Sequence, residues 1–422
     1  MSLKKIAVCI DSYNIDYSPS IINLLDCLAD GFEIDLFLRN VFLSKSHVLA
    51  RESIHIYRVR EDFSFSYFWK SGKQKLKEII KMLLLRKNAG SGKRAGNGGL
   101  SVKKTRKQVE IFDYYRHICM DPHGFLLCKE LFPGSRPIYY SLELYLKDDY
   151  MDAYYPPGVM RELNRLMDRE RTMSDDIGAL IIQSKEKEEL FKKDYGLPED
   201  LPVFILPVTY TGAAVKGKSN YLREMYGIAE DRRIAIHLGG MNDWFSCIEI
   251  AEVFSRMPGW VLFFQGNHSN DYLKRFDRVI CGEKAKNIIV SRTFYDQLDS
   301  LDRVMMSADL GIAWYNNISK NFTHTGRSSG KIAAYMRFGL PTIAKNYPSM
   351  VDAIENPGCG LCVDEYHEIE EAVKKIEGNV KFFSENAFRE YEKTYWFEKY
   401  RERLLEFIKS FGGRRDPFSK GS

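Results

Sequence analysis

The feature that most constrains the fold is an alternation of short apolar runs with amphipathic segments, which occurs twice along the chain. The first series begins at residues 6–10 and ends at 203–206; the second begins at 233–238 and ends at 369–376. Apolar runs of about four to eight residues between helical segments are typical of parallel strands that helices cover on both faces. The sequence therefore predicts an α/β protein with two doubly wound, Rossmann-like domains.

The predicted strands set the domain boundaries. In the first series they lie at residues 6–10, 33–38, 54–59, 111–118, 137–141, 179–183 and 203–206. In the second series they lie at residues 233–238, 260–265, 288–290, 310–314, 341–344 and 360–363. A polar joint at 209–219 separates the two series, so we expect an N-terminal domain at 1–208 and a C-terminal domain at 209–386. Residues 387–410 have the pattern of one long aromatic helix, which leads into a tail ending at residue 422.

Parallel sheets of this kind bind ligands at one edge. The ligand lies outside the carboxyl ends of the strands, at the point where the strand order reverses. Two such sheets in tandem therefore predict a site in the cleft between the two domains. The three spaced glycines that bind a dinucleotide are missing after the first strand of either series, so we expect no dinucleotide cofactor.

The basic charge of the chain is concentrated in one insert, at residues 70–107. The insert holds thirteen Lys and Arg residues and a single acid, Glu78, whereas the whole chain has a net charge of only +5. Residues 67–87 have the pattern of a Trp-led amphipathic helix with a lysine face, which is typical of helices that lie on anionic membranes. A surface helix packed on its own domain is the alternative. No nucleic-acid-binding module accompanies the charge, so we expect no nucleic-acid partner.

Other features exclude several classes of protein. No stretch approaches the ~20 apolar residues of a membrane-spanning helix, and the first residues do not have the pattern of a secretory signal. Eight scattered cysteines favour a reduced, cytoplasmic protein over a disulfide framework. Cys359 and Cys362 lie in a glycine turn before a strand, which favours neither a redox motif nor a metal site. We therefore expect a cytoplasmic protein, at most peripheral to the inner face of a membrane.

Three loops follow strands of the second series at the predicted ligand edge. Gly239 and Gly240 form the first, where backbone amides can approach a ligand oxygen, although a Gly-Gly turn is also a routine strand exit. The second contains Arg292 and Thr293, which we place near a nucleotide base or, alternatively, in a turn that caps a helix.

The third loop, at residues 321–331, carries the strongest local signal. Serine is a helix-capping residue, and the free amides at a helix start attract anions. Arginine and lysine side chains add the positive charge that suits a diphosphate. The alternative is an ordinary capped helix with two surface cations. The residues that we assign to a diphosphate site in this loop are Arg327, Ser328, Ser329, Gly330 and Lys331.

The sequence around the third loop resembles a known family. Residues 329–344 read SGKIAAYMRFGLPTIA, which is similar to the donor-site helix of GT-B glycosyltransferases of the family 4 type. Residues 298–314 and 358–364 resemble two further segments of that family, a helix and strand ending in Ala-Asp-Leu-Gly-Ile and a Gly-x-Gly-Leu-x-Val-Asp strand. The resemblance extends over residues 233–376 and is topological before that. It implies a GT-B fold, in which two Rossmann-like domains face a central cleft.

The resemblance also implies a function. Enzymes of this family move a sugar from a nucleoside diphosphate sugar to an acceptor, with the donor on the C-terminal half and the acceptor on the N-terminal half. We expect a hexosyltransferase that is retaining, uses no metal or other cofactor, and acts on a saccharide or lipid-linked acceptor in cell-surface polysaccharide or glycoconjugate synthesis. The alternatives are a catalytically silent GT-B-like protein that binds a sugar nucleotide or a partner, and a sugar-nucleotide epimerase.

The sequence departs from the family pattern in two ways, and the first favours the silent alternative. The family usually has Glu at the positions of Gly326 and Ala334, where the carboxylates contact the sugar and the ribose of the donor. The Arg and Lys that usually follow the first strand of the C-terminal domain are missing from residues 239–247. We expect Arg327 and Lys331 to replace that positive charge.

The first half of the chain supplies the remaining candidates. Asp121 and His123 follow a predicted strand, and the family often places Asp or His in this loop, facing the donor sugar. We expect His123 to orient a hydroxyl or share a proton, and Asp121 to stabilise positive charge at the anomeric carbon. A turn in which both satisfy local backbone amides is the alternative. Ser12, Tyr13 and Asn14 follow the first strand and are the acceptor-side candidates.

The predicted helix at 387–410 resembles the C-terminal segment of the family, which crosses back onto the N-terminal half. Trp396 and Phe397 would then pack there as core residues.

Overall fold

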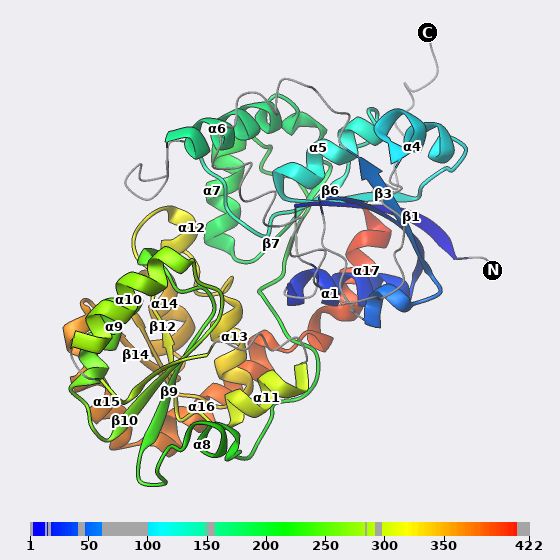
Figure 1. Cartoon of the computed structure of the whole chain (residues 1–422). Helices are drawn as coiled ribbons and strands as arrows, with labels where there is room; N and C mark the ends of the chain where they lie inside the picture. The colour runs from blue at the N-terminus through cyan, green and yellow to red at the C-terminus, as the bar shows by residue number, and fades with distance from the viewer. Residues whose placement is uncertain are drawn as a thin grey trace, which may run out of the picture.

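The computed structural model has two α/β domains, each built on one parallel sheet (Figure 1). It describes residues 3–12, 15, 18–40, 47–60, 100–147, 149, 157–282, 285–291 and 298–411. The prediction of two doubly wound sheets is confirmed, because each domain alternates parallel strands with helices on both faces.

The N-terminal sheet has eight strands in the order β4-β3-β2-β1-β5-β6-β7-β8. Their bounds are β1 Lys4–Asp11, β2 Phe32–Arg39, β3 Ile54–Arg60, β4 Leu100–Ser101, β5 Arg116–Met120, β6 Ile138–Tyr140, β7 Ala179–Ile182 and β8 Val203–Ile205. All neighbouring strands are parallel. The chain builds outward from β1 to β4 and then returns to place β5 beside β1, so the strand order reverses between β1 and β5.

The C-terminal sheet has six parallel strands in the order β11-β10-β9-β12-β13-β14. Their bounds are β9 Arg233–Leu238, β10 Trp260–Gln265, β11 Ile288–Val290, β12 Leu310–Ala313, β13 Thr342–Lys345 and β14 Gly360–Val363. Here the order reverses between β9 and β12. The two reversal points are the positions at which doubly wound sheets bind ligands.

Helices cover both faces of each sheet (Figure 1). In the N-terminal domain these are α1 Pro19–Ala29, α4 Val102–Val109, α5 Asp121–Leu131, α6 Pro157–Arg171 and α7 Lys185–Tyr195. In the C-terminal domain they are α8 Tyr221–Tyr226, α9 Cys247–Ser255, α10 Asn270–Gly282, α11 Leu298–Met306, α12 Lys320–Thr323, α13 Gly330–Arg337, α14 Pro348–Met350, α15 Ile369–Glu377 and α16 Val380–Glu390. A last helix, α17 Glu398–Ser410, belongs to neither series.

The core follows from the two-residue period of a strand. In β1, Ile6, Val8 and Ile10 face the cluster that includes residues of α1 and α17, whereas Ala7 and Cys9 face the cluster that includes residues of α4, α5 and α7. Both sets are fully buried, since helices cover both faces of a parallel sheet. This is why the strands read as unbroken apolar runs.

Two expected boundaries are wrong. The strand predicted at 111–118 begins only at Arg116, because Ile111 lies in the turn after α4 with 81% of its surface exposed. The loop predicted at Asp121 is instead the first turn of α5, which starts directly after β5.

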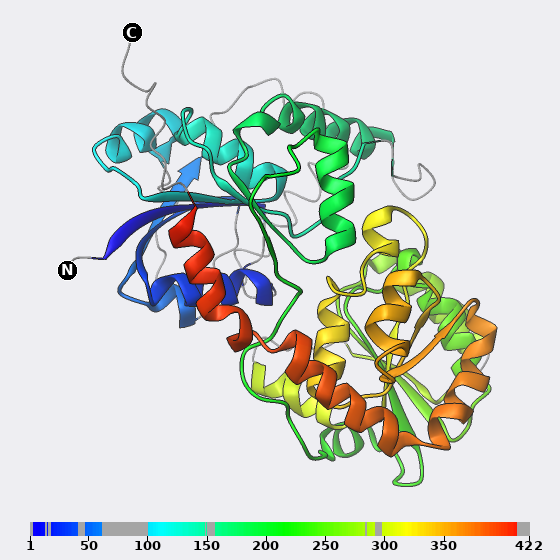
Figure 2. The ribbon, with the colours of Figure 1, turned by 180° about the vertical axis from the view of Figure 1, so that it is seen from behind.

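The long helix predicted at 387–410 is also wrong, because it is broken. After α16, residues Tyr391–Tyr395 form a π-helical turn. The backbone is then extended at Trp396, and a separate helix, α17, follows. Figure 2 shows α17, in red, crossing from the C-terminal domain to the N-terminal domain. Phe397 is fully buried there, as expected, but Trp396 packs against the core of the C-terminal domain.

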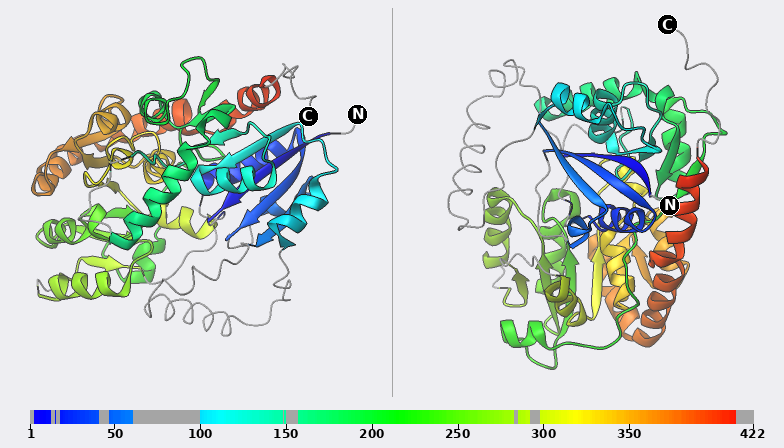
Figure 3. Two further views of the ribbon diagram at one scale, coloured as in Figure 1. Left: turned by 90° about the horizontal axis from the view of Figure 1, so that it is seen from above. Right: turned by 90° about the vertical axis from the view of Figure 1, so that its right-hand side faces the viewer.

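The two domains are joined by two crossing segments that pair with each other. The Tyr210 amide donates to the Tyr395 carbonyl at 2.9 Å, and the Phe397 amide donates to the Tyr210 carbonyl at 3.0 Å. Beyond this point, Arg401 of α17 forms ion pairs with Asp26 and Asp30 around the end of α1. Figure 3 shows that both ends of the described chain lie on the N-terminal domain.

The predicted membrane helix at 67–87 lies outside the described residues. The end of the insert is described: it returns to the sheet as β4 and continues into α4, whose Lys103, Lys104, Arg106 and Lys107 are all exposed. No described helix is both long and apolar enough to cross a membrane.

Candidate active site

The carboxyl ends of the two sheets face each other where the domains meet (Figure 1). At the reversal point of the N-terminal sheet, β1 leads to Ser12 and β5 leads to Asp121. At the reversal point of the C-terminal sheet, β9 leads to Gly239 and β12 leads to Trp314 and Tyr315. The predicted loops therefore lie at the two edges where ligands bind in such sheets.

Tyr335 of α13 holds β9 and β12 together at this edge. Its hydroxyl lies 3.1 Å from the carbonyls of both Ile236 and Ile312, which share its one hydrogen, and it accepts from the Leu238 amide at 3.0 Å. Its ring lies against Gly311, where a Cβ atom would be 2.5 Å from the ring. The ring therefore lies against the face of the sheet where β9 and β12 pair, and it places α13 beside the exit of β9.

The glycine loop depends on a backbone that only glycine adopts easily. Gly239 has φ +110°, and its carbonyl oxygen is only 1.7 Å from where a Cβ of Gly266 would lie. Asn316 holds the same loop from the exit of β12, because its side-chain Nδ2 donates to the Asp243 carbonyl at 2.7 Å. The loop is thus fixed by its neighbours. The amides of Gly239 and Met241 already donate to the carbonyls of Gln265 and Asn267, at 2.8 Å each, so these two amides are not free for a ligand oxygen.

Lys331 lies between the glycine loop and two aromatic rings. Its Nζ is 4.3 Å from the ring centroid of Phe245 and 4.7 Å from that of Tyr315. A Cβ on Gly239 would be in van der Waals contact with Lys331 Cε, at 3.7 Å, so the lysine side chain lies directly beside the glycine loop. Only 8% of Lys331 is exposed, and its Nζ has no hydrogen-bond partner among the described residues.

Burial without a hydrogen-bond partner disfavours the charged form of an ammonium group. Burial lowers the pKa of Lys331 from 10.5 to about 8. Burial and the charge of Lys331 also lower the pKa of His237, which lies under the glycine loop with Nε2 3.1 Å from the Gly240 carbonyl. An anion bound here would supply the missing partner, so the site has a net preference for negative charge.

The start of α13 adds a second attraction for anions. Ser329 is the N-cap, as predicted: its Oγ accepts from the Ile332 amide at 3.2 Å and lies 2.6 Å from the Tyr315 hydroxyl. The amides of Gly330 and Lys331 begin the helix and cannot be satisfied within it. Ser328 Oγ lies 3.4 Å from the Thr325 carbonyl.

Arg327 has a different environment from Lys331. Its guanidinium forms an ion pair with Glu390 at 2.6 Å and lies 3.3 Å from the Asp352 carbonyl. The structure therefore places the Arg327 charge on α16 rather than on the glycine loop. Of the two cations proposed from the sequence, Lys331 is the one whose charge is unmatched.

The two positions that carry Glu in the resembling family are structural here. A Cβ on Gly326 would be 2.0 Å from the Ser349 carbonyl oxygen, so this backbone has no room for any side chain there. Ala334 is 4% exposed and belongs to the apolar core under the C-terminal sheet. Neither position could hold a carboxylate without a change in packing.

In the N-terminal domain, Asp121 holds a neighbouring loop. Its backbone is left-handed, with φ +51°, and its side chain is 2% exposed. Oδ1 accepts from the amides of Leu142 at 2.7 Å and Glu143 at 3.2 Å. This is the arrangement of the alternative interpretation, in which Asp121 satisfies backbone amides. Burial and the charge of Glu143 raise the pKa of Asp121 well above its usual range.

His123 is exposed in the first turn of α5. Ser12 is also exposed, has φ +62°, and donates its hydroxyl hydrogen to Asp11 at 2.9 Å. The acceptor-side candidates Tyr13 and Asn14 and the base-side candidates Arg292 and Thr293 lie outside the described residues.

The sequence analysis missed a group of residues that joins the domains at the site. Asn321 of α12 contacts Leu144 and Lys187 of the N-terminal domain, at 2.9 Å each, and also Glu143. Asp149 accepts from the Lys320 amide at 2.7 Å. Asn321 is the first residue of the third predicted loop, but no motif marks its role, since these residues come together only when the two domains meet. Figure 1 shows α12 beside the end of α7.

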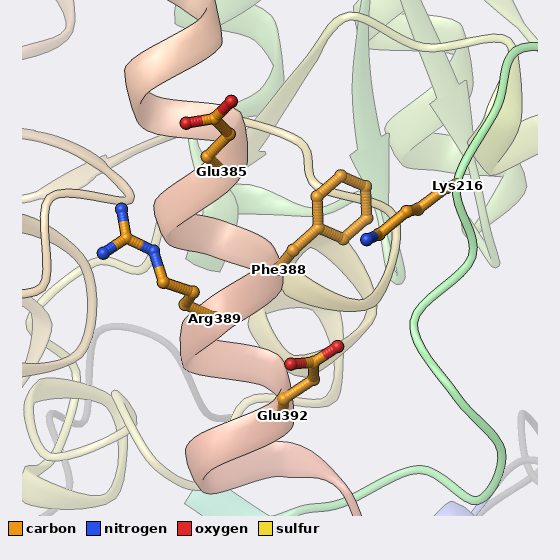
Figure 4. Close-up of a pocket in the computed structure, with 5 residues that line it drawn as sticks. All are labelled: Lys216, Glu385, Phe388, Arg389 and Glu392. Carbon is orange, nitrogen blue, oxygen red and sulfur yellow. The ribbon is translucent and has the colours of Figure 1, made fainter.

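A surface hollow of about 300 Å³ lies elsewhere, on α16 (Figure 4). It is lined by Lys216, Glu385, Phe388, Arg389 and Glu392, whose charges alternate in sign. It is away from the carboxyl ends of both sheets, so we do not assign the active site to it. The described residues contain no group of three or more His, Cys, Asp or Glu that could hold a metal ion.

Two Rossmann-like domains with facing strand ends, and a last helix that returns to the first domain, define the GT-B fold. Residues 277–384, which contain the turn before α13 and α13 itself, match the family described as "Glucosyltransferase 3-like, C-terminal domain". No curated protein matches the chain in sequence.

Several solved structures share the fold over nearly the whole chain. HepE from Anabaena, solved with UDP and glucose, is 12% identical with a TM-score of 0.64, covering 97% of this chain and 100% of HepE. Sucrose-phosphate synthase from Thermosynechococcus elongatus is 12% identical with a TM-score of 0.65, covering 96% and 98%. WaaG, a glycosyltransferase involved in lipopolysaccharide biosynthesis, is 14% identical with a TM-score of 0.60, covering 96% and 100%. At these identities the likeness shows the fold, and the predicted GT-B fold is confirmed.

Proposed function

We propose that the protein is a glycosyltransferase that transfers a hexose from a nucleoside diphosphate sugar to a saccharide or lipid-linked acceptor. The observation that carries the proposal is the buried, unpartnered ammonium of Lys331, between the glycine loop and the start of α13. The match of residues 277–384 to a glucosyltransferase-like family supports the same activity. HepE, which shares the fold, was solved with UDP and glucose, and this supports a uridine nucleotide as the first donor to test.

The site would act mainly on the leaving group. A nucleoside diphosphate gains negative charge when the bond to the sugar breaks. Lys331 and the first amides of α13 are fixed before that charge develops, so they stabilise it without reorganising. This chemistry requires no metal, and we propose that the protein needs none. We also propose a retaining reaction, on the resemblance to family 4 enzymes.

The acceptor would bind on the N-terminal domain. Ser12 and His123 are exposed at the carboxyl end of its sheet and are the described residues that we propose to contact acceptor and sugar. We further propose that the protein acts at an anionic membrane surface in cell-surface polysaccharide or glycoconjugate synthesis. The exposed cations of α4 and the exposed Ile111 beside them support this, because basic side chains next to an apolar one suit a lipid headgroup layer.

A silent, binding-only protein is the second candidate. The packing of Gly326 and Ala334 favours it, because both family carboxylates are replaced and neither position has room to restore one. Binding and transfer assays separate the two candidates. Both predict stabilisation by a nucleotide, but only the enzyme releases nucleoside diphosphate from a sugar nucleotide.

The test begins with thermal unfolding of the full chain in the presence of UDP, GDP and ADP sugars, since a ligand that binds only the folded state raises its stability. The nucleotide sugar that stabilises is then used for release and transfer assays with Lys331→Met, and with Lys374→Met as a matched control on the exposed surface of α15. We expect Lys331→Met to lose binding and Lys374→Met to keep it. Equal binding by both variants would disprove the proposed site.

A further inference from the structure

We propose that Glu143 is a further contact that the N-terminal domain makes with the donor sugar, and that Asn321 of the C-terminal domain is the residue that positions it. The inference rests on the proposed function and deepens it, because it assigns the carboxylate that positions 326 and 334 do not supply.

The Asn321 side chain belongs to one domain and is satisfied by the other. Its Oδ1 accepts from the Leu144 amide and from Lys187 Nζ, at 2.9 Å each, and its Nδ2 donates to Glu143 Oε2. Lys187 is 1% exposed, so one of these partners is a buried cation. Hydrogen bonds that involve charged groups are among the strongest in proteins. Asn321 therefore fixes the loop of residues 142–144 against the C-terminal domain.

Glu143 is held at its backbone and on one side of its carboxylate. Its amide donates to Asp121 Oδ1 at 3.2 Å, and its carbonyl accepts from the Ser141 hydroxyl at 3.0 Å. Oε2 faces Asn321, whereas Oε1 has no hydrogen-bond partner among the residues that the structure describes. The side chain is exposed at the carboxyl end of the sheet. An oriented carboxylate with one open oxygen can accept a hydrogen bond from a sugar hydroxyl.

Glu143 and the anion site of the opposite domain are coupled electrostatically through Tyr315. Burial raises the pKa of the Tyr315 phenol, and the charge of Glu143 raises it further. The same ring contacts Lys331, and its hydroxyl is 2.6 Å from Ser329 Oγ at the start of α13.

Phe322 connects Asn321, which contacts Glu143, with the aromatic rings around Lys331. It follows Asn321 in α12, and its ring centroid is 6.2 Å from that of Phe245 and 6.1 Å from that of Tyr315, the two rings around Lys331. The residue that positions Glu143 and the rings that enclose Lys331 are therefore parts of one packed unit. A donor whose diphosphate lies on Lys331 would have its sugar within reach of the loop that α12 holds.

The test uses the full chain and a sugar nucleotide that the wild type turns over. Glu143→Gln keeps the shape and removes the charge, and Asn321→Ala removes the positioning contact. Glu162→Gln on the exposed face of α6 is the matched control. For Glu143→Gln we expect UDP affinity within about twofold of wild type and kcat/KM for the sugar nucleotide about 10- to 100-fold lower, the range for losing a hydrogen bond to a charged group. Glu143→Asp should recover part of the loss.

Coupling between the two residues separates positioning from general damage. If Asn321 acts only through Glu143, the double variant Asn321→Ala/Glu143→Gln is no worse than Glu143→Gln alone. Losses that multiply in the double variant, or a Glu143→Gln enzyme as active as wild type, would overturn the inference and leave the proposed function standing. A wild-type protein that neither binds UDP nor cleaves any sugar nucleotide would overturn both.

Discussion

Replacing Lys331 with methionine should stabilise the ligand-free protein while removing nucleotide binding. The ammonium is 8% exposed with no hydrogen-bond partner among the described residues, so the folded chain holds an unfavourable charge when no ligand is bound. Methionine has a similar length and no charge, and it suits the rings of Phe245 and Tyr315. The two effects have opposite signs, which general disruption of the fold would not produce.

The magnitude follows from the lowered pKa. A pKa of Lys331 that falls from 10.5 to about 8 on folding corresponds to about 3 kcal/mol at neutral pH. The contacts with the two rings offset part of this, by about 0.5–2 kcal/mol. We therefore expect Lys331→Met to raise the free energy of unfolding by about 1–3 kcal/mol. For a domain of about 150–250 residues, this increase corresponds to a rise in Tm of about 2–12 °C.

The pH dependence has a definite sign. Between about pH 8 and pH 10.5 the unfolded chain keeps the proton on Lys331 and the folded chain loses it, so wild-type stability should rise with pH relative to the variant. Urea unfolding of both proteins at pH 7 and pH 9.5, with and without UDP, measures this. The reasoning is refuted if Lys331→Met is less stable than wild type without ligand, or if the stability difference does not narrow at pH 9.5.

Three further predictions follow from packing and burial. Gly326→Ala should lower the free energy of unfolding by more than about 2 kcal/mol, because its Cβ would meet the Ser349 carbonyl at 2.0 Å; wild-type urea stability would contradict this. Burial raises the pKa of Glu170, in α6, from 4.5 to about 7, so wild-type stability should fall as the pH rises from about 4.5 to about 7, by up to about 3 kcal/mol. Glu170→Gln should show a flatter stability profile between pH 5 and pH 8. Phe397→Ala should lower the free energy of unfolding of the N-terminal domain by about 3–5 kcal/mol, because the ring is fully buried. Amide exchange at Tyr139 measures this, and an unchanged exchange rate would mean that α17 is dispensable.

Much of the fold could be predicted from the sequence because a buried parallel strand needs no polar residues. The errors occurred where an apolar residue is not in the core or where a tertiary contact decides the backbone. Ile111 reads as part of a strand but lies exposed in a turn. The break before α17 depends on hydrogen bonds between Tyr210 and the backbone of Tyr395 and Phe397, which no local pattern shows.

Only the part of the candidate site that is formed by residues close together in the sequence could be predicted. The capping serine and Lys331 are neighbours in the sequence, so their joint role could be inferred from spacing. The match between Arg327 and Glu390, 63 residues apart, could not, and neither could the contact between Glu143 and Asn321, 178 residues apart. Contacts between residues that are far apart in the sequence leave no periodic pattern, so only the folded structure shows them.

The paired crossing segments determine how the domains can turn. Because Tyr210 is hydrogen-bonded to Tyr395 and Phe397 of the returning segment, the two connections between the domains are held to each other, and a rotation of one domain must move both connections together. The Val208 amide donates to the Arg327 carbonyl at 2.9 Å, and this bond attaches the paired connections directly to the segment leading into α13. Movement of one domain relative to the other would therefore shift the segment leading into α13, where we propose that the nucleotide binds, so the bound and the ligand-free protein should differ in the range of domain orientations they adopt.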